Sequence, residues 1–200
     1  MASPLLIAAL CMGKRHTRAF LFCFAGMGMC LLSAYLNTFL AALYGADAFA
    51  ATVEIAPVVE EGMKLLPLLF YLLVFEPQAR QIGIAAVITA LSFATFENIC
   101  YLIQNGAAHF SFIFFRGIGT GAMHVICGAI VGGGLAYVWR RTWLKIAGTC
   151  GLLGAAITFH AIYNLLIAYG GTAQYIAYLL PVGILAAGKL IARYLKAAEG

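Results

Sequence analysis

The chain has 200 residues, of which 64% are hydrophobic and 10% are charged, and its net charge is +5. Soluble domains carry roughly 25% charged residues, so this chain has too few polar side chains to cover a water-facing surface. The composition excludes an ordinary soluble domain, and no basic tract with interleaved aromatic residues suggests a nucleic-acid partner. Lipid permits helices or closed barrels, and the long apolar runs favour an all-α polytopic membrane bundle.

Six strong transmembrane spans are predicted in chain order, at roughly residues 19–44, 53–75, 81–104, 110–138, 144–169 and 173–195. Residues 4–12 are too few for a comfortable span, so they form either a truncated first helix or an interfacial segment. The short connecting loops imply antiparallel neighbours. We expect residues 1–200 to form a single membrane domain.

The loop charges predict an orientation. Ten of the 12 Lys and Arg residues fall at loops or span ends on one side of the predicted bundle. The opposite loops, at residues 45–52, 105–109 and 170–173, contain none. Under the positive-inside rule the basic side is cytoplasmic.

Six cysteines occur without a CxxC pair, and most lie in apolar runs where cysteine acts as a small hydrophobe. Cys127 follows His124 by three residues, and Cys100 follows Glu97 by three. Nothing in the sequence supplies an activating arrangement for either thiol, so a cysteine nucleophile is disfavoured.

Polar and ionisable residues inside the predicted spans are the second main signal. Such groups are costly at membrane depth and usually mark function. They lie on four successive spans at helical spacing, and the set comprises Glu60, Glu61, Lys64, Glu97, Asn98, Tyr101, Arg116, His124, His160 and Asn164. Lys64 can neutralise a carboxylate three or four residues before it on the same helix.

Depth brings these residues together. Counted from the non-cytoplasmic ends, Glu61, Glu97, Arg116 and His160 lie roughly 9–14 Å into the membrane, and His124 lies deeper. This layer predicts one shared, partly hydrated cavity. A carboxylate in a low-dielectric pocket becomes a usable general base, and His, Asn or Arg can stabilise an oxyanion. These groups suit peptide-bond hydrolysis by activated water.

Four sequence blocks within residues 54–164 resemble those of the PrsW family of intramembrane proteases. Residues 57–64 resemble its P-x-x-E-E-x-x-K signature, and residues 96–101 resemble F-E-N-x-x-Y. Arg116 and His124, with the glycines that follow them, resemble the third block, and residues 160–164 resemble H-x-x-x-N. The blocks occur in family order.

The resemblance implies a glutamic-type intramembrane endopeptidase of the superfamily that includes the CAAX proteases. It implies a prokaryotic plasma-membrane location and cleavage of membrane-anchored proteins or peptides, such as anti-sigma factors, near the extracytoplasmic side. It also assigns roles. The implied catalytic residues are Glu60, Glu61, Glu97, His124 and His160, and the implied supporting residues are Lys64, Asn98, Tyr101, Arg116 and Asn164.

Among the three glutamates the sequence favours Glu61 as the base but does not separate it from Glu60. No cofactor is expected. The rival mechanism is a His₂Glu zinc site, whose ligands would come from separate helices because HExxH is absent. Two rival functions stay open: a transporter that uses the same charges as a relay, and a scaffold or immunity protein that binds a peptide without cutting it. One member of the wider clan, a γ-secretase subunit, is a scaffold of this kind.

Overall fold

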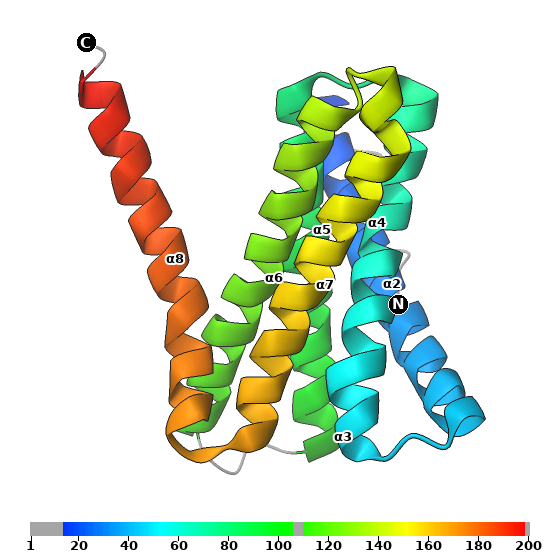
Figure 1. The fold of residues 1–200 in the computed structure, drawn as a ribbon, viewed down its shortest axis with the longest axis vertical. Helices are drawn as coiled ribbons and strands as arrows, with labels where there is room; N and C mark the ends of the chain where they lie inside the picture. The colour runs from blue at the N-terminus through cyan, green and yellow to red at the C-terminus, as the bar shows by residue number, and fades with distance from the viewer. Residues whose placement is uncertain (1–13, 106–109, 199–200) are drawn as a thin grey trace.

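The computed structural model describes residues 14–105 and 110–198, and every regular element within them is a helix (Figure 1). The chain order is α2 (Lys14–Tyr44), α3 (Ala48–Ala50), the π-helix η1 (Ala51–Ile55), α4 (Ala56–Phe75), α5 (Ala79–Asn105), α6 (Phe110–Val138), the 3₁₀ turn η2 (Thr142–Leu144), α7 (Lys145–Tyr169) and α8 (Gly171–Ala198). The prediction of an all-α protein is confirmed for this part of the chain.

Each predicted span coincides with a long helix, but six spans are not confirmed. Five helical segments of the described residues are long and apolar enough to cross a membrane, namely Thr17–Tyr44, Ala79–Gln104, Ile113–Val138, Thr142–Tyr169 and Gly171–Tyr194. The exception is α4, whose 20 residues include Glu60, Glu61 and Lys64. The presence of three charged residues in one helix, and not a low apolar content, sets α4 apart from the five segments. Helix α4 packs against α2, α5 and α7. The segment at residues 4–12 lies outside the described residues.

Tight turns reverse the chain between the long helices. Gly45 and Gly170 end α2 and α7 with φ of 61° and 74°, values that glycine adopts without a Cβ clash. Asp47 begins the next helical segment, because its carboxylate accepts the Ala50 amide at 2.8 Å. These short connections place the helices beside their chain neighbours.

Small residues bring α5 and α6 close together. A Cβ added at Gly128 would lie 2.7 Å from the Ala90 Cβ, and one at Gly132 would lie 2.4 Å from the Ala86 Cβ. Both alanines are buried. Without a hydrophobic driving force between helices in lipid, such close backbone approach is a main source of association.

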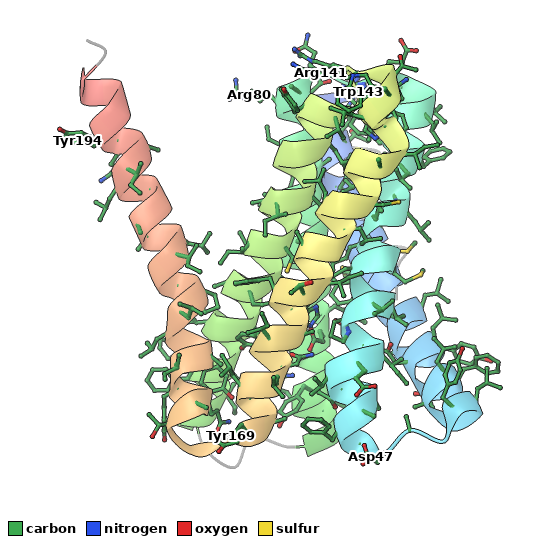
Figure 2. The ribbon with its side chains drawn as sticks, viewed as in Figure 1. Asp47, Arg80, Arg141, Trp143, Tyr169 and Tyr194 are labelled. Atoms are coloured by element: carbon green, nitrogen blue, oxygen red, sulfur yellow. The ribbon has the colours of Figure 1, made fainter. Side chains whose placement is uncertain are left out.

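The two ends of the bundle differ in charge, and α8 diverges from the rest. Figure 2 places Arg80, Arg141 and Trp143 at one end and Asp47 and Tyr169 at the other. Helix α8 meets α6 and α7 near its first residues and then splays away from them (Figure 1). The cavity described below lies toward the end marked by Asp47.

We predict that Gly132→Val lowers the free energy of unfolding by about 1–3 kcal/mol, because the added carbons must push α5 away. Thermal unfolding in detergent measures this loss. The matched control is Gly133→Val, since nothing lies within 4 Å of a Cβ at Gly133. Both variants change helix propensity equally, so equal unfolding temperatures would contradict close packing at Gly132.

Candidate functional site

Glu61 lies at the centre of the polar core. Its Oε1 accepts from Lys64 Nζ at 2.6 Å and lies 2.7 Å from His160 Nδ1. The two side chains that form this ion pair are 2% and 7% exposed. A buried carboxylate is stable only when it is paired and hydrogen-bonded, and Glu61 meets both conditions. Helices α4 and α7 are thereby joined through one oxygen atom.

His124 on α6 extends this network to α5. Its Nδ1 lies 2.8 Å from Lys64 Nζ, and its Nε2 lies 2.7 Å from Glu97 Oε2. An ammonium group has no lone pair and acts only as a donor, so Nδ1 accepts and Nε2 carries the proton toward Glu97. Lys64 therefore fixes the tautomer of a histidine as well as neutralising Glu61.

Aromatic rings close this network off from lipid. The Phe93 ring centroid lies 4.8 Å from Lys64 Nζ and 5.4 Å from the centre of the His124 ring. The two histidine rings meet edge to face, with centroids 5.0 Å apart. Phe93 and His124 are fully buried. The low local dielectric strengthens each electrostatic contact here.

A polar cavity of about 660 Å³ lies against this network, on the side toward Asp47. Its lining includes Glu60, Glu97, Arg116 and His160, whereas Glu61 and His124 are not among the lining residues. The carboxylates are thus divided: Glu60 and Glu97 face the cavity, and Glu61 lies behind it. Consecutive helical residues point about 100° apart, which explains how Glu60 and Glu61 separate.

Glu60 and His160 present two facing acceptors at the cavity. Because His160 Nδ1 donates to Glu61, its Nε2 carries a lone pair, and Nε2 lies 3.8 Å from Glu60 Oε2. That oxygen is buried and has no hydrogen-bond partner among the described residues. The 3.8 Å separation leaves space for one water molecule or one metal ion to contact both acceptors.

Asn37 on α2 is a site residue that the sequence reasoning missed. Its Nδ2 donates to Glu60 Oε1 at 3.4 Å, and its Oδ1 is buried without a partner in the described part of the chain. It also lines the cavity. The signal was available, since Asn37 is a polar residue in an apolar span at a depth similar to that of Glu61. It lacks a charge, and no motif block contains it.

The Arg116 guanidinium holds the α5 side of the cavity. It donates to the Asn98 side-chain oxygen, lies 3.4 Å from Glu97 Oε1 and stacks 3.6 Å from the Tyr101 ring centroid. The structure therefore brings Asn98, Tyr101 and Arg116 together beside Glu97.

Asn164 bonds to the backbone and not to another side chain of the site. Its Nδ2 donates to the Thr52 carbonyl at 2.9 Å, within the π-helix η1, while Glu61 orients His160. Nearby, Thr120 and Tyr163 share a hydrogen bond of 3.0 Å. π-helical turns leave the backbone in an unusual register. The bond from Asn164 holds this backbone in place where Thr52 lines the cavity.

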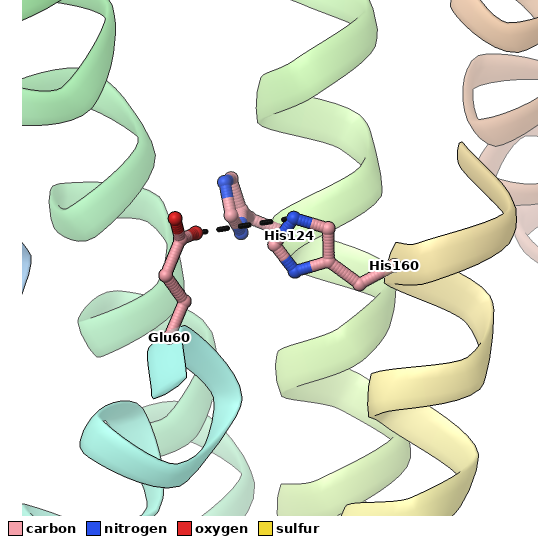
Figure 3. Close-up of side chains that lie close together, drawn as sticks. All are labelled: Glu60, His124 and His160. Carbon is pink, nitrogen blue, oxygen red and sulfur yellow. Dashed lines mark ion pairs between the residues drawn. The ribbon is translucent and has the colours of Figure 1, made fainter. Parts of the chain in front are cut away.

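The donor set fits a divalent cation in composition. Glu60, His124 and His160 each offer one ligand atom, and the three atoms lie within 4.8 Å of one another (Figure 3). Two histidines and a glutamate are typical zinc ligands, and the Glu61 bond to His160 Nδ1 is the orienting contact that metal-bound histidines usually have. His124 would have to give up one of its present hydrogen bonds to serve as a ligand.

These observations define a helical membrane protein with a carboxylate–histidine centre at an internal polar cavity. The chain belongs to the PrsW family: a family model described as PrsW family intramembrane metalloprotease matches residues 14–187. Searches of curated proteins and of solved structures gave no significant match. The resemblance stated from the four motif blocks is confirmed, and membership supports intramembrane proteolysis as the activity.

We predict that Lys64→Met destabilises the protein by about 3–5 kcal/mol, because it leaves Glu61 as a buried charge without its cation. The double variant Glu61→Gln/Lys64→Met removes both charges and should recover most of the loss. Thermal unfolding in detergent compares the two. If the double variant were no more stable than Lys64→Met, the proposed role of the ion pair would be wrong.

Proposed function

We propose that the protein is an intramembrane endopeptidase that hydrolyses a peptide bond of a membrane-anchored protein or peptide with glutamate-activated water. The observation that carries the proposal is the pair of facing acceptors, Glu60 Oε2 and His160 Nε2, which lies at a polar cavity also lined by Glu97. A water molecule held there can reach both a base and a substrate carbonyl.

Glu97 is the general base in this proposal. Its side chain is 27% exposed and lines the cavity, whereas the Glu61 side chain is 2% exposed and does not line it. Glu97 takes a proton from the water, and the water oxygen attacks the carbonyl carbon. The proton then passes to the amine nitrogen as the C–N bond breaks. Access to the cavity favours Glu97 for this role over Glu61, which the sequence alone preferred.

The remaining residues position these groups. Glu61 orients His160, and Lys64 holds His124 in the tautomer that donates to Glu97. Arg116 lies at the cavity wall beside Glu97, where its positive charge can stabilise a developing oxyanion. Each part of the water-activating group is therefore held by a neighbour on a different helix.

The description of the family as metalloproteases implies a metal, contrary to the expectation of no cofactor. Glu60, His124 and His160 would hold such a cation. A bound divalent cation would supply a Lewis acid that lowers the cost of forming hydroxide and an oxyanion. The proposal includes this His₂Glu site, the rival mechanism left open by the sequence, with Glu97 still acting as the base. When the cation is bound, His124 would give up its bond to Lys64 or to Glu97.

The cavity's position supports the proposed side of cleavage. It lies toward the end of the bundle opposite Arg80 and Arg141, which is the extracytoplasmic end if the basic loops are cytoplasmic (Figure 2). Membrane-anchored substrates of the anti-sigma-factor type, in a prokaryotic plasma membrane, are the substrate class that the family resemblance implies.

We predict that Glu97→Gln and His160→Ala each lower the cleavage rate by at least about 100-fold, because each removes a group that acts on the water. Rates are measured in nanodiscs on single-pass membrane proteins that mass spectrometry shows to be cleaved in wild-type cells and intact in Glu97→Gln cells. The control is Glu54→Gln, which changes an exposed carboxylate that does not line the cavity. Full cleavage by both site variants would sink the proposal.

Two other results would show that the protein has a function other than proteolysis. Substrate capture without any product from the wild-type protein would identify a scaffold. Charge movement or solute flux in liposomes, without cleavage, would identify a transporter.

We predict that the purified protein retains about one divalent cation per chain and that Glu60→Gln and His160→Ala lose it. Elemental analysis after size-exclusion chromatography measures the content, and chelation should lower the cleavage rate until zinc is restored. Full activity in a preparation free of metal would instead assign the reaction to Glu60 and Glu97 without a cation.

A further inference from the structure

A second cavity, of about 530 Å³, lies at the basic end of the bundle between α2, α5 and the end of α4. Its lining includes Arg18, Phe22, Tyr71, Gln78, Arg80 and Gln81. It shares no lining residue with the cavity at Glu60 and Glu97. The proposed hydrolytic function leaves this cavity unexplained.

The mouth of this cavity is positively charged. Arg18 and Arg80 are exposed and lie at the starts of the membrane-spanning parts of α2 and α5. Within the described residues neither guanidinium takes part in a salt bridge. Glu76, the acidic residue closest in sequence to Arg80, is not among the lining residues. Two guanidinium groups that share one opening are suited to a phosphate group, which they can bind bidentately.

Gln81 adds a further donor to this mouth. Its Oε1 accepts the Gln78 amide at 3.0 Å, so its side-chain NH₂ is the part left to donate.

Two apolar grooves adjoin this cavity. One, of about 190 Å³, runs between α2 and α5 and is lined mainly by Cys23, Met27, Ile88, Leu91 and Ile99. The other, of about 450 Å³, runs between α5 and α6 past Gly83, Val87, Ala129 and Gly133. Ile88 borders the mouth and both grooves, and Arg80 borders the mouth and the second groove. The charged cavity thus adjoins one apolar groove at Arg80 and Ile88 and a second groove at Ile88.

The groove between α5 and α6 has a length suited to one leaflet. On α5 it runs from Arg80 to Ile88, eight residues or roughly 12 Å along the helix, and half of a hydrocarbon core is roughly 15 Å. An acyl chain that starts at Arg80 would therefore follow this groove most of the way to the bilayer centre. The groove between α2 and α5 lies deeper and is bordered on α5 by Ile88 to Ile99.

We propose that this site binds one anionic diacyl phospholipid from the leaflet on the basic side of the bundle. Arg18 and Arg80 hold its phosphate, and its two acyl chains lie in the α2/α5 and α5/α6 grooves. Anionic lipids enrich the cytoplasmic leaflet, which is the side that the positive-inside rule assigns to these arginines.

The bound lipid would act on the helix that carries the hydrolytic centre. Tyr71 of α4 lines the charged cavity, and its ring lies 5.0 Å from that of Phe22 on α2. Arg80 and Gln81 belong to α5. A lipid at this position contacts three helices at once, so it stabilises their arrangement in the way that any ligand of the folded state does.

The test is native mass spectrometry of the purified chain in detergent, with phosphatidylglycerol or phosphatidylcholine of identical acyl chains added. We expect the wild type to retain phosphatidylglycerol at least about tenfold more strongly than phosphatidylcholine. Arg18→Gln/Arg80→Gln should abolish this preference. The matched control is Arg140→Gln/Arg141→Gln, which removes the same charge at the same end and should leave the preference unchanged.

Two further measurements test whether the acyl chains contribute to binding in addition to the phosphate group. Gly133→Leu places a side chain in the α5/α6 groove while keeping both arginines, and it should weaken retention of phosphatidylglycerol severalfold. Inorganic phosphate at millimolar concentration should not displace the lipid, because it has no chains for the grooves. Equal retention of both lipids by the wild type, equal loss in the control variant, or displacement by phosphate would overturn the proposal. None of these measurements depends on cleavage.

Discussion

The burial of Glu61 with Lys64 is the constraint on which the rest of the site depends. A carboxylate and an ammonium at this depth are tolerable only as a pair, and their remaining bonding capacity must also be used. Glu61 uses it to orient His160, and Lys64 uses it to fix His124. The stability requirement of one ion pair therefore sets the direction of both imidazole rings. Structure and chemistry are coupled here because the same two side chains serve both.

As a result, the three glutamates have different hydrogen-bond partners and different environments. Glu61 is fully engaged in the core, Glu97 shares bonds with His124 and Arg116, and Glu60 keeps one oxygen without a partner among the described residues. Unsatisfied buried oxygen is costly in a membrane bundle. Its presence beside the His160 lone pair favours a bound water or cation over a purely structural role. The geometry thus ranks three glutamates that the motif treats alike.

Much of this could be read from the sequence, for identifiable reasons. Helical spacing and depth follow from counting residues, so the layer that unites Glu97 and His160 was predictable. Helix α4 is predicted as a span from its apolar residues but is not among the five segments able to cross a membrane, because three charged site residues lie within it. The hydrogen-bond partner of Asn164 was not predictable from the sequence. It is a backbone carbonyl of a π-helix, and no residue pattern predicts where a π-helix forms. Asn37 was not predicted as a site residue, because a single uncharged amide in an apolar helix does not by itself indicate a functional site.

The adjacency of Glu60 and Glu61 has a consequence for how the protein tolerates change. The two residues differ by one step on the helix, yet one faces the cavity and the other faces the core. Inserting or deleting a residue before them would rotate α4 by about 100° and exchange their surroundings. The π-helix η1 precedes α4, and a change in its turns could compensate for such a rotation. The bond from Asn164 to the Thr52 carbonyl holds η1 in its present register. Across related sequences, the segment from η1 to Lys64 should therefore vary in composition far more readily than in length.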